Sequence, residues 1–381
     1  MATADGLTRP AVPTRTELAG RYAELCETLR RCAPQADTDD ALPEAVFEAL
    51  RSSGVLGAAI GTEYGGHGGD AELTNRLIEL VATADPSVAI ILFQHYAVSA
   101  RISEWGTPAQ RDRYLPKLAD GSWIAASAWS ESGAGADKRN LATKARRVDG
   151  AWVLDGAKTF TTGAGLAQVY LVLAQSSEPT RTISTYGSDG QTFYLIEADN
   201  PGLVANTGMD LVGMRASATG FVELAGCRVA DSAVLGPVGD AVRIIAGVRE
   251  SGATLGAVSL GIAEAAYRLA YTHAVRRGLD GAQAVRYRLV DLEAKVCAAR
   301  ALVDSSGRRD TADPGVTTLH SKLHASQVSE EVTAEALRLL GSAGFLRDHP
   351  LNKLARDARA VGLMGPINDL CRELVSAPWT S

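Results

Sequence analysis

Residues 105–137 read WGTPAQRDRYLPKLADGSWIAASAWSESGAGAD, and the pattern of the chain changes within them. Up to about Leu118 the apolar residues recur with helical spacing, whereas from Trp123 onward short alternating or β-branched runs indicate strands. The stretch ends in SAWSESGAGAD, where glycines and small hydroxyl residues let a backbone lie close to a ligand. This ending predicts a ligand-binding turn, with a Gly-rich surface turn as the alternative.

The predicted elements follow one another in the order α, β, α. Helical periodicity runs to about Leu118, strand patterns continue to about Gly236, and helical periodicity returns from Asp240. The Ser- and Thr-rich stretch 176–191 is typical of a loop inside the β region. We therefore predict three domains: 1–122, 123–237 and 238–381.

The composition indicates a globular protein with a large core. The chain has 381 residues, of which 46% are hydrophobic and 22% charged, and its net charge of −6 argues against nucleic acid as a partner. Five cysteines are scattered without metal-ligand spacing, so we expect free thiols and no metal site. The N-terminal segment lacks the pattern of a signal peptide, and no apolar run is long enough to span a bilayer. We expect a cytoplasmic protein that does not bind membranes.

Seven motifs link the chain to a known family. They are EYGGHGG (63–69), WGTPAQRDRYLPKLADGSWIAA (105–126), SESGAGAD (130–137), LDGAKTFTTGA (154–164), MRASATGFVELAGCRVADSAVLG (214–236), LLGSAGF (339–345) and RDAR (356–359). In these motifs and their order the chain resembles the acyl-CoA dehydrogenase superfamily. The resemblance implies an FAD enzyme with an α+β fold: an N-terminal helical domain, a middle β-barrel and a C-terminal four-helix bundle. It also implies a homotetramer or homodimer.

On this resemblance two segments would line the flavin. The residues implied are Ser127, Trp129, Ser130, Gly135 and Ala136 in the first segment, and Phe160 and Thr162 in the second. Ser130 would bond to the isoalloxazine, and Phe160 would take the place of the family's usual Trp. Because side chains alternate along a strand, we expect Phe160 and Thr162 to share a face and to meet one ring.

The resemblance also implies residues that contact the adenine half of a neighbouring subunit's FAD. They are Arg277, Arg338, Gly341 and Ser342. Two positions depart from the family pattern, since Asp280 stands where an aromatic residue is usual and Arg338 stands where Gln is usual. Each arginine can donate a forked pair of hydrogen bonds to phosphate, or can be an ordinary residue at a helix end.

The family's usual catalytic base is missing. Removal of an α-proton from a thioester needs a carboxylate, and most relatives carry a Glu in the turn after RDAR, where this chain has Gly365. A minority carry the base on the helix that opens the C-terminal domain. That position aligns near Ser251, next to Glu250, which we take as the candidate base. The alternative is that Glu250 pairs with Arg249 or faces solvent.

The resemblance further suggests a substrate-binding set. Its members are His95, Ala136, Ser251, Met364 and Gly365. A family serine is replaced by Ala136 and a family arginine by Gly252, and with Gly256 these residues predict a roomy, weakly polar groove for a bulky or carrier-bound acyl chain.

Three functions remain open from the sequence. The first is FAD-dependent α,β-dehydrogenation of an acyl thioester, carried on CoA or on an acyl carrier protein in specialised metabolism, with a flavoprotein or O2 as electron acceptor. The second is a flavin monooxygenase or N-hydroxylase, which needs no α-proton base. The third is a non-catalytic scaffold that has kept only the architecture.

Overall fold

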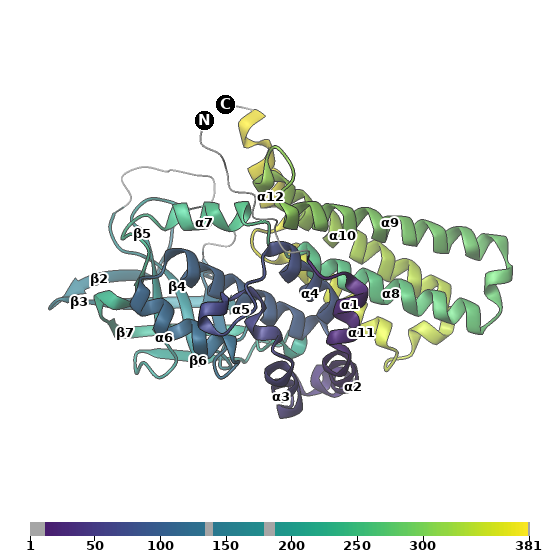
Figure 1. The fold of residues 1–381 in the computed structure, drawn as a ribbon, viewed down its shortest axis with the longest axis horizontal. Coiled ribbons are helices and arrows are strands. Elements are labelled where there is room, and N and C mark those ends of the chain that lie inside the picture. Colours follow the sequence, from purple (N-terminus) through teal and green to yellow (C-terminus); the bar gives the residue numbers. More distant parts are fainter. Residues whose placement is uncertain (1–11, 134–139, 179–186, 380–381) are drawn as a thin grey trace.

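The computed structural model describes residues 12–133, 140–178 and 187–379 (Figure 1). A β-sheet lies at one end of the long axis and a bundle of long helices extends to the other end, with the N-terminal helices packed beside the junction. The predicted order α, β, α is therefore confirmed. Half of the predicted loop at 176–191, residues 179–186, falls outside the described residues.

Six α-helices form the described N-terminal part, from residue 12 onward. They are α1 (Arg15–Arg21), α2 (Ala23–Asp39), α3 (Glu44–Ser53), α4 (Ala71–Ala82), α5 (Pro86–Trp105) and α6 (Pro108–Ala119). The start of α6 shows why they form where they do: Thr107 caps the helix in a reciprocal capping box with Gln110, and Pro108 occupies the first turn, where no N–H is needed.

The middle of the chain forms an eight-stranded sheet. The strands are β1 (Ala125–Ala128), β2 (Lys144–Val148), β3 (Ala151–Thr161), β4 (Val169–Gln175), β5 (Gln191–Glu197), β6 (Leu203–Asn206), β7 (Gly220–Val229) and β8 (Val234–Leu235). Their order is β6-β7-β3-β2-β4-β5-β8, and β1 pairs with β4 in parallel. Among the described residues the two outer strands, β6 and β8, do not pair with each other. The expected closed barrel is thus wrong in detail, and the sheet is open.

Strand β4 shows what the sheet packs against. Leu171 and Leu173 belong to a core shared with α5, α6 and α7, which includes Val98 and Leu115. Tyr170, on the alternate face, belongs to a separate core made by the sheet itself. Both faces of β4 are therefore buried, one against helices α5, α6 and α7 and the other within the sheet's own core.

Six helices complete the chain. They are α7 (Ala241–Glu250), α8 (Gly256–Arg276), α9 (Gln283–Arg308), α10 (Pro314–Leu340), α11 (Pro350–Leu363) and α12 (Asn368–Ser376). Helices α8 to α11 form the predicted four-helix bundle, and α12 is a short helix that follows it. Within the described ranges we find no helix both long and apolar enough to cross a bilayer.

Two glycines let α8 pass between its neighbours. A Cβ on Gly256 would lie 2.7 Å from the carbonyl oxygen of Ser321 on α10, and one on Gly261 would lie 2.4 Å from that of Glu79 on α4. Because both distances are shorter than real Cβ contacts, only glycine permits these two close crossings.

His95 on α5 joins three elements from a fully buried position. Ala125 N, at the start of β1, donates to its Nδ1 at 3.4 Å, so Nε2 carries the proton and donates to the carbonyl oxygen of Leu56 at 3.2 Å. Burial lowers the pKa of His95 to about 4. The imidazole is therefore neutral and acts as a structural cross-link.

The low pKa of His95 predicts acid sensitivity. In the unfolded chain the imidazole takes up a proton as pH falls through 6.5, whereas the folded protein resists protonation down to about pH 4. Folding stability is therefore lost between these values, by about 3 kcal/mol for this group alone. Thermal unfolding measured from pH 7.5 to 4 should show a shallower decline in H95Q, whose amide can still donate to Leu56. Identical slopes in both proteins would contradict this assignment.

Candidate functional site

The end of β3 presents an aromatic ring to the outside. Phe160 is 65% exposed and has a φ of +52°, and the pairing of β3 with β7 shifts register between Lys158 and Thr161. This irregularity interrupts the strand, so alternation alone does not place Phe160 and Thr162 on one face, and their contact with one ring stays a prediction. Phe160 points outward while Thr162 is buried and lies 3.2 Å from the hydroxyl of Thr219.

The end of β1 lies directly beside this ring-bearing segment. Thr159 N donates to Ser130 O at 2.9 Å, which joins the two stretches predicted to line the flavin. Trp129 packs on Phe193, with ring centroids 4.9 Å apart, and its buried Nε1 has no hydrogen-bond partner among the described residues. Ser127 lies in β1 itself, paired with Leu171 of β4. Gly135 and Ala136 lie outside the described residues.

A buried ion pair holds the two segments together, and the sequence analysis missed it. Lys158 Nζ lies 2.6 Å from Glu131 Oε1, with side chains 0% and 4% exposed. Glu131 also accepts hydrogen bonds from Ala142 N at 2.6 Å and Thr143 N at 3.1 Å. Burial lowers the pKa of Lys158 to about 8, whereas the pKa of Glu131 falls because Lys158 and these N–H groups outweigh its own burial. Glu131 follows Ser130 in sequence and Lys158 lies two positions before Phe160, and this closeness to two flavin-lining candidates could have suggested the pair.

These segments fit a planar aromatic cofactor. Phe160 offers an outward-facing ring for stacking. The indole N–H of Trp129, which lacks a partner in the described part of the chain, and the nearby hydroxyl groups could supply polar contacts. Ser217 extends the hydroxyl group cluster, since its Oγ lies 2.8 Å from Thr219 Oγ1. The residues present therefore agree with an isoalloxazine lying against the ends of β1 and β3.

The turn between α11 and α12 contains Gly365, where a base was expected. The turn includes Met364 and Pro366, and its backbone is held by Lys322 of α10. Lys322 Nζ donates to Met364 O at 3.0 Å and to Pro366 O at 2.6 Å. Residues 362–366 provide no carboxylate.

Glu250 ends α7 as an exposed side chain. Within the described parts of the chain it forms no ion pair or hydrogen bond, so a pair with Arg249 is not observed, and its exposure agrees with the other alternative, a side chain that faces solvent. A Cβ built on Gly315 would lie 3.9 Å from Glu250 Cγ, which places the carboxylate beside the first turn of α10. Burial raises the pKa of the Cys371 thiol on α12, and the positive charges of Lys322, Arg372 and Arg249 partly offset this effect. Ser251 Oγ donates to Val248 O at 2.8 Å and closes the helix end.

The glycines expected to widen a substrate groove are packed against backbone instead. Gly252 has a φ of +83°, and a Cβ there would lie 2.3 Å from Ser306 O. Its carbonyl accepts bonds from Asn75 Nδ2 and Ser306 Oγ, both at 2.9 Å. Gly256 is occupied by its close crossing with α10. The prediction of a roomy groove at these two residues is therefore wrong.

His95, also placed in the substrate set, faces away from solvent. Both ring nitrogens contact backbone groups, so neither is available to a ligand in this conformation. The partly exposed residues of the same helix are Phe93, Gln94, Ala97, Ala100, Ser103 and Trp105. The sequence alone could not predict which face of α5 is covered, because that depends on where β1 packs against it.

The RDAR motif joins the three parts of the chain. Asp357 Oδ1 accepts from Met214 N at 2.6 Å, and Lys353 Nζ lies 2.7 Å from Asp357 and 2.9 Å from Asp85. Arg356 pairs with Asp37 at 2.5 Å. The motif therefore fixes α11 to the loop before β7 and to the N-terminal helices.

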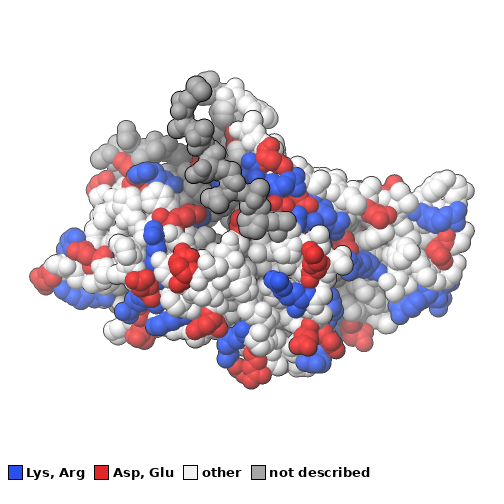
Figure 2. Space-filling view, viewed as in Figure 1, with Lys and Arg blue, Asp and Glu red and all other residues white. Residues whose placement is uncertain are grey.

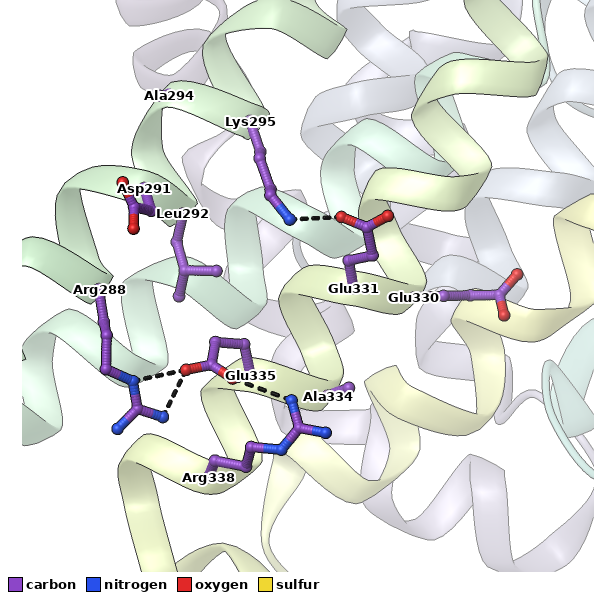
Figure 3. Close-up of a pocket in the computed structure, with 10 residues that line it drawn as sticks. All are labelled: Arg288, Asp291, Leu292, Ala294, Lys295, Glu330, Glu331, Ala334, Glu335 and Arg338. Atoms are coloured by element: carbon purple, nitrogen blue, oxygen red, sulfur yellow. Dashed lines mark hydrogen bonds and ion pairs between the residues drawn. The ribbon is translucent and has the colours of Figure 1, made fainter.

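The residues expected to meet adenine lie at the far end of the bundle. Arg277 caps α8, and Gly341 and Ser342 follow α10, so all three lie at the end remote from the sheet (Figure 1). Arg338 is exposed and bonds to Glu335 at 3.0 Å, and Glu335 also pairs with Arg288 (Figure 3). These three side chains line part of a groove of about 730 Å³ between α9 and α10. No cluster of metal ligands occurs in the described portion.

Comparison with known proteins gives consistent matches along the chain. Three family models match: the N-terminal domain of acyl-CoA dehydrogenase at residues 17–122, its middle domain at 126–227 and its C-terminal domain at 243–377. A relative named "Probable acyl-CoA dehydrogenase" from Mycobacterium tuberculosis is 31% identical over 353 residues, covering 90% of this chain and 89% of the relative.

Solved structures share the whole fold. Butyryl-CoA dehydrogenase from Megasphaera elsdenii matches with a TM-score of 0.89 and 25% identity, covering 98% of this chain and 100% of the other. The prolyl acyl carrier protein oxidase AnaB matches with a TM-score of 0.84, covering 97% and 100%; at 22% identity this likeness concerns the fold alone.

The buried pair predicts a large effect of a single substitution. In K158M the carboxylate of Glu131 stays buried without its cation, which should cost about 3–5 kcal/mol of stability, while K158M/E131Q should recover much of the loss. Both proteins are compared by chemical denaturation and by uptake of FAD.

The matched control is K295M, which breaks the exposed pair between Lys295 and Glu331 and should cost no more than about 1 kcal/mol. Equal losses in K158M and K295M would contradict the importance of the buried pair.

Proposed function

Because the chain belongs to the acyl-CoA dehydrogenase family, we propose that it oxidises the α,β-bond of an acyl thioester. It is a flavoprotein oxidoreductase, and FAD is its cofactor. Bound FAD supplies an acceptor for the hydride that leaves the β-carbon. The family membership carries this proposal and favours an enzyme over a non-catalytic scaffold.

We assign the flavin-binding role to the ends of β1 and β3. Phe160 would stack on the ring system, and Trp129 Nε1, which lacks a partner among the described residues, would donate to a polar atom of the cofactor. Ser127, Ser130 and Thr162 would complete this wall. The cross-link between Glu131 and Lys158 keeps both segments in place before the cofactor binds, which reduces the entropy lost on binding.

We propose Glu250 as the group that accepts the α-proton. Its support is the exposed carboxylate at the end of α7, which has no partner within the described ranges, and the absence of a carboxylate from the turn at 362–366. A carboxylate with no competing partner is free to accept a proton and to release it to water. Ser251 and Met364 remain proposed neighbours of the substrate.

The carrier of the acyl group is a separate question. The proposal covers an acyl group on CoA or on a carrier protein, the latter in specialised metabolism. Because backbone occupies the space around Gly252 and Gly256, those residues no longer argue for a bulky carrier. Most of the similar proteins are named for CoA thioesters, which favours CoA as the carrier. Titration with an acyl-CoA and with an acyl carrier protein thioester distinguishes the two carriers. Electrons would pass to a flavoprotein or to O2.

A second candidate is a flavin monooxygenase or N-hydroxylase. Gly365 favours it, because such a reaction needs no carboxylate in that turn. The two candidates differ in anaerobic behaviour: a dehydrogenase is bleached by its thioester without oxygen, whereas a monooxygenase stays yellow until an external reductant such as NAD(P)H is supplied.

We also propose a homotetramer or homodimer in which the far end of the bundle serves a neighbour's FAD. Phe345, 90% exposed, and Leu346 lie in or next to the turn that carries Gly341 and Ser342, and Tyr287 and Val290 are exposed on α9. Exposed apolar side chains of this kind suit burial against a second copy. The domain limits at 122/123 and 237/238 also remain proposals.

The base assignment predicts a selective loss. E250Q should lower the rate of flavin bleaching by an acyl thioester by about 10³-fold or more while the protein stays yellow, because the amide cannot accept the proton. The exposed ion-pair residue Glu44 gives the control, E44Q, which should keep the original rate. Full bleaching activity in E250Q would exclude Glu250 as the base.

The oligomer proposal predicts a change in mass. F345E places a charge in the exposed apolar turn and should shift the protein toward smaller species in light scattering coupled to gel filtration, with weaker retention of FAD. An unchanged mass and an unchanged FAD content would argue that this end of the bundle is not an interface.

A further inference from the structure

Lys322 is a buried cation whose hydrogen bonds all go to one short segment. Its side chain is 3% exposed, and Nζ donates to Met364 O at 3.0 Å, Pro366 O at 2.6 Å and Asn368 Oδ1 at 3.1 Å. An ammonium group has three N–H donors, so these three contacts use all of them. Two of the acceptors flank Gly365 in the chain.

The acceptors are neutral oxygens. In the described part of the chain Lys322 forms no ion pair, and burial lowers the pKa of its ammonium to about 8. A methionine of similar shape would fill this space without the cost of burying a charge. Packing alone therefore does not explain a lysine here, whereas three directed bonds to the turn do.

Other contacts keep the same segment in register. Asn368 Nδ2 donates to Ser326 Oγ at 3.0 Å, one turn along α10 from Lys322. Beyond the turn, Leu370 and Leu374 of α12 pack on the core that α5, α6 and α7 share with the sheet. The turn is thus held by hydrogen bonds to α10, and the helix that follows it, α12, is held by the core next to the sheet. The carbonyl groups of the turn cannot rotate without breaking their hydrogen bonds to Lys322.

We infer that Lys322 is a positioning residue, which fixes the backbone from Met364 to Pro366 and so shapes the wall of the substrate site where relatives carry their base. The inference rests on the proposed function for the location of that site. A carboxylate side chain can adjust its own position, but a wall made of glycine backbone depends on what holds it. Lys322 supplies this support from behind the turn.

The test measures the turn separately from catalysis. In the FAD-loaded K322M protein, hydrogen exchange in peptides covering residues 362–368 should become about tenfold faster or more, with little change in peptides from β3. The same protein should show about a tenfold higher KM for the thioester, a smaller change in kcat and an unchanged visible spectrum. K322R should not rescue these values, because a planar guanidinium cannot direct three donors as an ammonium does.

Two further variants keep the inference falsifiable. K295M, on the exposed side of α9, should leave exchange at 362–368 unchanged. If K322M does not fold, N368A removes one of the three acceptors and should give a smaller acceleration in the same peptides. Unchanged exchange at 362–368 in K322M, or in N368A when K322M does not fold, would overturn the inference. Because exchange needs no substrate, that failure is distinct from a failure of the proposed reaction.

Discussion

The site depends on a charge pair buried where two distant segments cross. Glu131 follows β1 and Lys158 lies in β3, and their contact brings the ends of both strands to one place. Removing two charges from water is expensive, so such a pair persists only with good geometry and extra hydrogen bonds. The N–H groups of Ala142 and Thr143 provide those bonds. In a regular strand Phe160, two positions after the inward Lys158, would face inward as well; the register shift between Lys158 and Thr161 and the φ of +52° at Phe160 accompany its outward position instead.

Local signals predicted the architecture well. The capping residues Thr107 and Gln110 lie just before α6 and in its first turn, and the periodicity of α8 to α12 is a property of each helix alone. The site was harder, because its decisive contacts join residues far apart. Glu131 and Lys158 are separated by 27 positions, and Lys322 reaches the turn 42 to 46 positions later. Gly252 and Gly256 looked like space only because Ser306 and Ser321 could not be placed from the sequence.

Charged side chains have different roles on the surface and in the interior of this protein. Figure 2 shows basic and acidic side chains interspersed over the visible face, which fits the modest net charge of −6. Beneath the surface several charged groups each stabilise a particular contact. Lys158 joins strands, Asp357 joins α11 to the loop before β7, and Lys322 holds a turn. Glu250 differs from them, since it stands at a helix end without a partner in the described residues.

The two close crossings of α8 have a mechanical consequence. At Gly256 and Gly261 main chain touches main chain, and no rotatable group lies between the helices. Elsewhere in a core a side chain can change rotamer to absorb a small shift, but here a displacement of α4 must carry α8 and then α10 with it. Helices α4, α8 and α10 therefore move together as one rigid unit. Substitutions that change the activity or specificity of this protein are tolerated better in the segments packed on this unit than within it.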